Sequence, residues 1–162
     1  MAATTLQELY VEEMRDLISG NDQMQAIMTA MAERASNEKL KSLFQKSIPG
    51  IGQHTQALIN MIGGDNRNIS CRAMEGLVEE CKRHALESDL PSELRDIALI
   101  AQYQRMSHYG IAGFGTVAAY AQALGRTDDV AQLKQIVSDI YRADEYSTQL
   151  AEGTERAVAM KP

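Results

Sequence analysis

Apolar residues recur at helical spacing in four long segments of the chain. Positions three, four and seven apart carry large side chains, a period typical of helices that bury one face. The first stripe comprises Tyr10, Met14, Leu17, Met24, Met28 and Met31, and the second comprises Leu40, Phe44, Ile51, Leu58 and Met61. The third comprises Ile100, Tyr103, Phe114, Val117 and Leu124, and the fourth comprises Val130, Leu133, Val137, Ile140 and Ala151. The pattern predicts an all-α fold with four long helices.

Each stripe is interrupted near its middle by a polar residue or by glycine. The interrupting residues are Asn21 in the first stripe, Ser47, Gly50 and His54 in the second, Ser107 and Gly110 in the third, and Asp144 and Ser147 in the fourth. Interruptions at one height on every helix are how a bundle forms a site in its core. The pattern therefore indicates a core pocket, whose chemistry depends on the residues that line it.

Capping residues set the expected boundaries of the first two helices. The first helix is expected to begin after a cap at Thr4 or Thr5 and to end at about Arg34. The second is expected to begin at Ser36–Glu38 and to reach about Ile62. Pro49 lies inside it and is expected to kink or break it, because proline removes a backbone donor and crowds the preceding turn.

The second half of the chain predicts a connecting helix and two long ones. Residues 71–87 read as the short connecting helix, and Ser92 is expected to cap a long helix that stops at Gly125. Thr127–Asp129 is expected to cap the last helix, which reaches about Glu155, with residues 158–162 frayed. One long crossover is the ferritin-like form of a four-helix bundle, and a plain up-down bundle is the alternative. We expect a single domain over residues 1–162.

Composition narrows the partners and the location. The net charge is −6 and the basic residues are scattered, which disfavours nucleic acid and anionic membranes as partners. No segment approaches the ~18 apolar residues of a membrane span, and no signal-peptide pattern opens the sequence, so a cytoplasmic protein is expected. Cys71 and Cys81 are then expected to be reduced thiols. The nine methionines are expected to fill irregular gaps in the core.

Two ionisable residues on apolar stripes are candidates for chemistry. His54 lies on the second stripe and Asp144 on the fourth. A buried carboxylate is costly unless it is paired, so a hydrogen bond or ion pair between these two residues explains both without a metal. Glu13 and Asp16 crowd the first helix and are expected to belong to a solvated acidic face, although Glu13 also lies on a helical seam.

Small residues on the third long helix predict self-association. A homodimer is expected, with an exposed apolar face on the third or fourth long helix as its interface. Close helix contact is favoured by a small-residue surface of Gly113, Gly115, Ala118, Ala119 and Ala121. His108 and Tyr109 lie one step off the apolar stripe, so they are expected either to face a dimer partner or to cap the pocket.

Four segments resemble the ferritin-like stress proteins of the YciE/YciF type, and the resemblance covers nearly the whole chain. The segments are ELYVEEMRDL (8–17), CRAMEGLVEE (71–80), QRMSHYGIAGFGT (104–116) and DEYSTQLAE (144–152). The resemblance implies a ferritin-like four-helix bundle, often dimeric, with a carboxylate-rich metal site in its core. It also implies an association with stress responses.

The sequence departs from this family at the positions that the resemblance assigns to metal ligands. The family's usual glutamates and histidine are replaced by Asn21, Ser47, Gly50, Ser107, Gly110, Asp139 and Ile140. A di-iron centre needs a glutamate from each of two helices and a Glu-x-x-His pair from each of the other two. Its metals need several anionic oxygens. The resemblance therefore implies a degenerate metal site.

Three functions follow from these observations. The leading hypothesis is a metal-free, stress-associated protein with a structural or binding role and no catalytic or cofactor-binding residues. Its vestigial pocket comprises Asn21, Ser47, Gly50, His54, Ser107, Gly110, Asp139, Ile140 and Asp144. The second is an oxidase or peroxidase with a remodelled iron or manganese site, whose ligands come from His54, Asp144 and Glu13 first, then Asp16 and Asp139. The third is a module that binds a small molecule in the space left by Gly50 and Gly110.

Overall fold

Four long helices lie side by side and a short one covers part of their surface. The computed structural model describes residues 2–65 and 67–162. The long helices are α1 (Leu6–Arg34), α2 (Glu38–Ile62), α4 (Ser92–Ala123) and α5 (Thr127–Ala159). Helix α3 (Arg72–Cys81) is followed by a π-helical turn, η1 (Lys82–Leu86). The predicted ferritin-like bundle with a short helix in its long crossover is confirmed.

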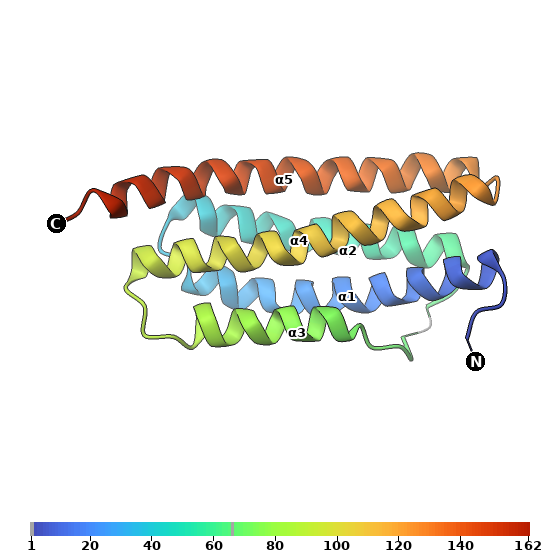
Figure 1. Cartoon of the computed structure of the whole chain (residues 1–162), viewed down its shortest axis with the longest axis horizontal. Coiled ribbons are helices and arrows are strands. Elements are labelled where there is room, and N and C mark those ends of the chain that lie inside the picture. The colour runs from blue at the N-terminus through green and yellow to red at the C-terminus, as the bar shows by residue number, and fades with distance from the viewer. Residues whose placement is uncertain (1, 66) are drawn as a thin grey trace.

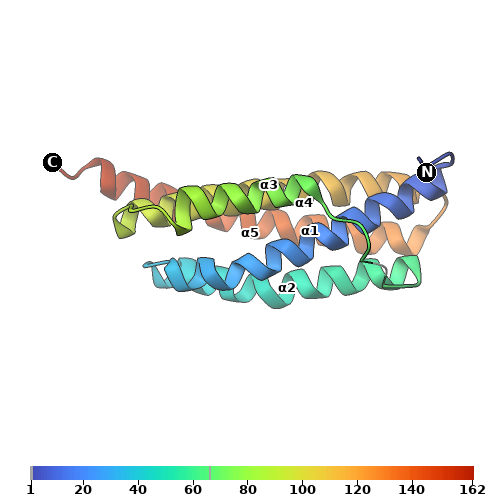
Figure 2. The ribbon, with the colours of Figure 1, turned by 90° about the horizontal axis from the view of Figure 1, so that it is seen from below.

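The helices pair in chain order. Helix α1 packs mainly against α2 and α4 mainly against α5, while contacts of α1 with α4 and of α2 with α5 close the bundle. Figures 1 and 2 show α3 on the outside, beside α1 and α4. The face between α2 and α5 has no such cover. None of the described helices is long and apolar enough to span a membrane.

The first two helices begin and end close to their predicted positions. Thr5 accepts a hydrogen bond from the backbone of Glu8 and Glu8 bonds back to Thr5, forming a capping box. Asn37 caps α2 through the backbone nitrogens of Lys39 and Leu40. Gly63 ends α2 with a φ of 70°, a conformation that favours glycine because it has no Cβ.

The predicted caps of the last two helices were wrong by one residue, and the end of α5 was also wrong. Pro91 takes the N-cap position of α4 with an extended ψ of 150°, and Ser92 is already helical. Arg126 holds the same position before α5, ahead of Thr127. Helix α5 runs past Glu155 to Ala159, so residues 158 and 159 are helical.

The predicted break at Pro49 is also wrong, because α2 continues through it. Pro49 and Gln45, the residue one turn before it, both lie on the exposed face of the helix. The carbonyl that proline leaves without a backbone donor therefore faces water. On the inner side, the amide of Gln25 donates to the carbonyl oxygen of Ile48 at 2.9 Å and ties this turn to α1.

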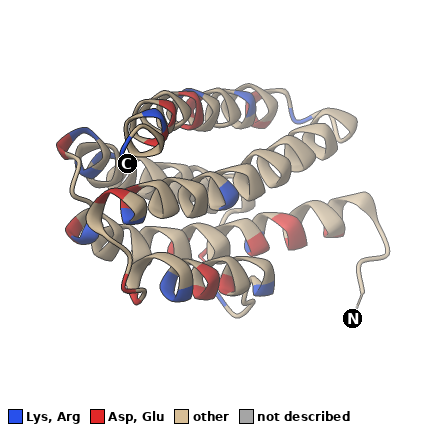
Figure 3. Cartoon of the chain, turned by 60° about the vertical axis from the view of Figure 1, so that its left-hand side comes forward, with Lys and Arg blue, Asp and Glu red and all other residues tan. Residues whose placement is uncertain are grey.

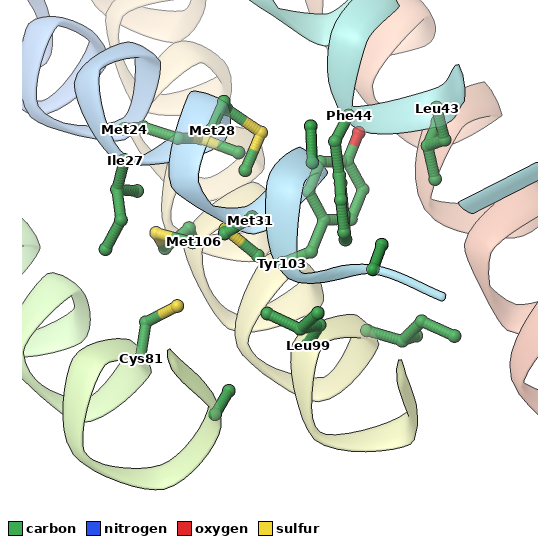
Figure 4. Close-up of a cluster of buried hydrophobic side chains, with 14 of the residues drawn as sticks. Met24, Ile27, Met28, Met31, Leu43, Phe44, Cys81, Leu99, Tyr103 and Met106 are labelled. Atoms are coloured by element: carbon green, nitrogen blue, oxygen red, sulfur yellow. The ribbon is translucent and has the colours of Figure 1, made fainter. Parts of the chain in front are cut away.

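Methionine fills much of one end of the core, as predicted. Figure 4 shows Met24, Met28, Met31 and Met106 in one buried cluster with Leu99 and Tyr103. A second cluster at the other end centres on Tyr10, Met14, Leu17, Leu58 and Phe114. Flexible thioethers adapt to gaps that branched side chains leave open. Both cysteines are free and buried, and burial raises the pKa of Cys81 to about 11.

Charged residues of both signs mix over the surface, with one exception. Figure 3 shows Lys and Arg among Asp and Glu along the helices in view. Residues 106–125, most of α4, contain no Lys, Arg, Asp or Glu. The outer face of this run is an exposed uncharged strip comprising His108, Ala112, Gly115, Ala119 and Gln122.

The predicted small-residue surface on α4 is divided between the inside and the outside of the bundle. Ala118 and Ala121 are buried within the chain. A Cβ on Gly113 would lie 2.4 Å from Cδ2 of Leu17, so this glycine is where α4 approaches α1 closely. Only Gly115 and Ala119 of the five are exposed. The surface that was expected to hold a partner is thus largely an internal contact.

Replacing Gly113 by alanine is expected to destabilise the protein by up to about 2 kcal/mol. Alanine favours a helix over glycine by about 1 kcal/mol, but forcing a methyl group against a buried leucine costs about 1–3 kcal/mol. Gly115→Ala is the matched control, because a Cβ there meets no atom within 4 Å. In urea unfolding, Gly115→Ala is expected to raise the free energy of unfolding. If Gly113→Ala raised it as well, the close contact between Gly113 and Leu17 would be contradicted.

Candidate functional site

A cavity of about 280 Å³ lies at mid-height, where residues of the two core clusters meet. Its apolar wall comprises Leu17, Met24, Leu43, Ile51, Met74, Met106, Ile140 and Ala143. Lys46, Gln53 and Asp139 also line it, and because these are its most exposed residues, the cavity opens between α2 and α5.

All but one of the residues predicted for the pocket line this cavity. They are Asn21 on α1, Ser47, Gly50 and His54 on α2, Ser107 and Gly110 on α4, and Asp139 and Ile140 on α5. Asp144 lies elsewhere, and the described lining includes neither Glu13 nor Asp16. Tyr103 and Lys46 also line the cavity and were not predicted to, and Tyr109 lines it as well. Tyr103 lies on an apolar stripe, so its hydroxyl gave no separate signal in the sequence.

The predicted pairing of His54 with Asp144 is wrong. His54 Nε2 lies 3.7 Å from Oδ2 of Asp139, while Oδ2 of Asp144 lies 3.0 Å from Nε2 of His108. Residues 139 and 144 are separated by about 7.5 Å along a helix, since each residue rises 1.5 Å. The apolar stripes define the face of each helix but not the height at which two helices align, so His54 meets a carboxylate more than one turn away from the predicted one.

The environment of His54 favours its neutral form. Burial lowers the pKa of His54, while the Asp139 carboxylate acts in the opposite direction. Partial burial acts to raise the pKa of Asp139, but hydrogen bonds from Gln135 and Arg142 and the positive charge of Arg142 leave it lowered. At 3.7 Å the histidine and the carboxylate are too far apart for a direct hydrogen bond. The ring of His54 instead packs edge-on against Phe114.

His54 is expected to make folding less favourable as the solution is acidified. Its pKa is lower in the folded protein than its ordinary value of 6.5, so the unfolded chain binds the proton more readily. The contribution of His54 to stability is therefore complete above about pH 6.5 and is lost as the pH falls through the lower folded-state pKa. Urea midpoints measured between about pH 7 and 5 should fall more steeply for the wild type than for His54→Gln. Parallel profiles would contradict the buried neutral ring.

Most polar groups around the cavity already have partners in the protein. Ser47 donates its hydroxyl hydrogen to the carbonyl of Leu43 at 2.9 Å, and its oxygen lies 3.2 Å from the hydroxyl of Tyr103. Because Ser47 has one hydrogen, Tyr103 is the donor of that second bond. Burial raises the pKa of Tyr103, so it remains a neutral donor at neutral pH.

Asn21 has a buried polar atom without a partner. Its side chain is buried at 9 % exposure, and its Nδ2 finds no acceptor among the described residues. A buried N–H donor without a partner costs about 1–3 kcal/mol. Asn21 lines the cavity from α1, and His54, whose ring lies beyond direct hydrogen-bond distance of Asp139, lines it from α2.

Tyr109 joins three elements beside the cavity. Its hydroxyl donates to Oδ2 of Asp16 on α1 and lies 3.1 Å from Sγ of Cys71, the residue before α3. Burial raises the pKa of Tyr109, and the bond to Asp16 acts in the same direction. Asp16 was predicted to belong to a solvated acidic face. It instead accepts a hydrogen bond from Tyr109. Tyr109 caps the cavity, which was one of the two predicted alternatives.

The donor set does not fit a di-metal centre. No group of three or more His, Cys, Asp or Glu side chains comes together as a metal site within residues 2–65 and 67–162. The cavity offers His54 and Asp139, and Arg142 already bonds to Asp139. Two divalent ions need several carboxylates to balance their charge. Asn21, Gly50, Gly110 and Ile140 supply none.

Four long helices joined by one long crossover, with a cavity at mid-height, define a ferritin-like bundle protein. The chain belongs to the family described as Domain of unknown function (DUF892), whose model matches residues 5–160.

Two relatives show how far the similarity extends. Protein YciF of Escherichia coli (strain K12) is 30 % identical over 155 residues, which is 93 % of each chain. The crystal structure of the E. coli stress protein YciF superposes with a TM-score of 0.90, at 29 % identity over 98 % of this chain and all of that one. YcfI, described as a putative structural protein from Rhodopseudomonas palustris, superposes with a TM-score of 0.83, at 25 % identity over 90 % of this chain and 94 % of its own.

Proposed function

We propose that this protein is a cytoplasmic, stress-associated bundle without a metal centre, and that its core cavity binds a small molecule. The observation that carries the proposal is the cavity wall, which is mostly apolar and is lined by Asn21, Gly50, Gly110 and Ile140, the residues for which the family resemblance implies glutamates. Pockets of this size with an apolar wall and few polar groups are typical of small-molecule sites. Binding there would supply a role that needs no catalytic residue.

The descriptions of the relatives are consistent with a stress-associated structural role. One is described as a stress protein and another as a putative structural protein. An oxidase with a remodelled site is the alternative, and it needs Glu13 or Asp16 to turn inward. Tyr109 binds the carboxylate of Asp16, so α1 contributes no carboxylate to the cavity from that position.

Metal analysis tests the first part of the proposal. Protein expressed with added iron and manganese and purified without chelators is expected to carry well under one metal ion per chain. A ferritin-like protein with an intact di-iron centre, purified in parallel, shows that the procedure retains bound metal. An anomalous X-ray scan across the iron, manganese and zinc edges gives the identity of any ion. Near-stoichiometric iron or manganese bound at His54 would overturn the proposal.

We also propose that the protein is a homodimer, with the exposed uncharged strip of α4 as its interface. The strip runs along one face of α4 between Arg105 and Arg126 and contains no Lys, Arg, Asp or Glu, so the helix itself brings few charges into such an interface. Small residues at Gly115 and Ala119 let two helices approach closely. Sedimentation at micromolar concentration is expected to give a dimer for the wild type and a monomer for Ala119→Glu. A monomeric wild type would contradict this interface.

A further inference from the structure

The wall of the cavity also indicates what kind of molecule it accepts. Resting on the small-molecule role proposed above, we infer that the ligand is an uncharged, mostly apolar compound with one carbonyl oxygen, which accepts a hydrogen bond from Asn21. Three features of the cavity carry the inference: its volume, its unpartnered amide and its lack of a free charge in the interior.

The volume sets the size of the ligand. An apolar cavity of about 150 Å³ accommodates benzene, and this one measures about 280 Å³. A compound with two fused rings therefore fits, on the order of ten to twelve non-hydrogen atoms. Leu17, Met24 and Ile51 give such rings an apolar surface, and the methionines adapt to their outline.

The unpartnered amide sets the polar group. Ser47 and Tyr103 bond to each other, whereas Nδ2 of Asn21 has no acceptor among the described residues. Nδ2 can only donate a hydrogen bond. A ligand group that accepts this bond therefore removes the free-energy cost of burying Nδ2 without a partner. A carbonyl oxygen accepts such a bond, and Asn21 lines the cavity in which a ligand would present it.

The ionisable residues of the cavity wall indicate the net charge of the ligand. His54 is held neutral by burial, and Asp139 is bonded by Gln135 and Arg142. Lys46 is exposed at the opening, and its chain keeps the ammonium group in water. The interior thus has no unpaired charge to balance an acid or an amine, and a buried ion without a partner is strongly unfavourable.

Three probes of similar shape separate the features. α-Tetralone has two fused rings and a carbonyl, tetralin lacks the carbonyl, and 1-naphthoate carries a charge. Calorimetric titration is expected to show α-tetralone binding about tenfold more tightly than tetralin, which corresponds to about 1.4 kcal/mol. Asn21→Leu, of similar volume, is expected to remove this preference while it still binds tetralin. Addition of α-tetralone, but not tetralin, should also shift the side-chain amide resonances of Asn21 in the wild type.

The outcomes distinguish this inference from the proposed function. Equal affinities for α-tetralone and tetralin, unshifted Asn21 resonances or tighter binding of 1-naphthoate would overturn the carbonyl inference and leave small-molecule binding in place. Gly50→Leu, which adds bulk to the lining, is expected to abolish binding of both uncharged probes, whereas Gly153→Leu on the exposed face of α5 is not. If no probe binds the wild type at millimolar concentration, the small-molecule role itself is overturned.

Discussion

Replacing Asp96 by alanine is expected to lower the free energy of unfolding by about 2–4 kcal/mol. Asp96 lies in the second turn of α4 and is only 2 % exposed. Its carboxylate accepts hydrogen bonds from the backbone nitrogen of Ser36 at 2.8 Å, the hydroxyl of Ser36 at 2.6 Å and the backbone nitrogen of Asn37 at 3.0 Å. These bonds join the turn between α1 and α2 to α4. Alanine leaves three donors without their charged acceptor.

Two control variants separate the hydrogen bonds from the loss of an acidic residue. Asp96→Asn keeps the shape of the side chain and one acceptor, and it is expected to lose about half as much stability. Asp89→Ala removes an exposed carboxylate just before the same helix and is expected to change stability by less than about 0.5 kcal/mol. Urea unfolding monitored by circular dichroism measures all three. A loss in Asp96→Ala no larger than in Asp89→Ala would show that the turn is held by other contacts.

The role of Asp96 also shows what the sequence could not predict. Helix positions follow from apolar period and local capping, so α1 and α2 were placed within a residue or two at each end. Asp96 precedes the apolar stripe of α4, so in the sequence it looks like a surface residue near the start of the helix. Its partners lie about 60 residues earlier, and only the approach of α4 to the α1–α2 turn brings them together.

The candidate site was likewise predictable only in part. The interrupted stripes indicated which face of each helix borders a core pocket, because that information is local and repeats with the helical period. The pairing of His54 with Asp139 depends on the relative height of α2 and α5, which no local pattern encodes. Tyr109 was found only as one of two alternatives, since its partners Asp16 and Cys71 come from α1 and from the loop before α3.

Pro49 shows that a strong local rule can also be overridden by its surroundings. The rule that proline breaks a helix does not hold in α2. A proline inside a helix interrupts it when the freed carbonyl is buried or the ring has no room. Here the outer face of α2 leaves that carbonyl in water, and Gln25 stabilises the inner side of the turn. The continuity of α2 matters for the site, because Ser47, Gly50 and His54 line one cavity only if the helix between them is unbroken.

Four glutamates introduced into the cavity are expected to create a metal centre, because they add carboxylates that the wild-type lining does not supply. The variant combines Asn21→Glu, Gly50→Glu, Gly110→Glu and Ile140→Glu, one position on each long helix. A Cβ on Gly50 would meet no atom within 4 Å. A Cβ on Gly110 would lie 3.5 Å from Cδ1 of Ile140, an ordinary van der Waals contact, and Ile140 is itself replaced in this variant, so both positions accept a side chain. With His54 nearby, the variant offers the anionic oxygens that iron and manganese require.

Without metal, four carboxylates in one cavity cannot all ionise, so the apo variant is expected to be less stable than the wild type. Metal binding then restores stability by mass action, by about 2.7 kcal/mol at a concentration one hundred times the dissociation constant. Metal content by mass spectrometry and the melting temperature with and without Mn²⁺ measure both effects. The matched control carries glutamine at the same four positions, which keeps the volume and removes the charge, and it is expected to bind no metal. If the glutamate variant binds no more metal than the glutamine variant, the cavity is not a metal site that has lost its ligands, and its apolar wall has another origin.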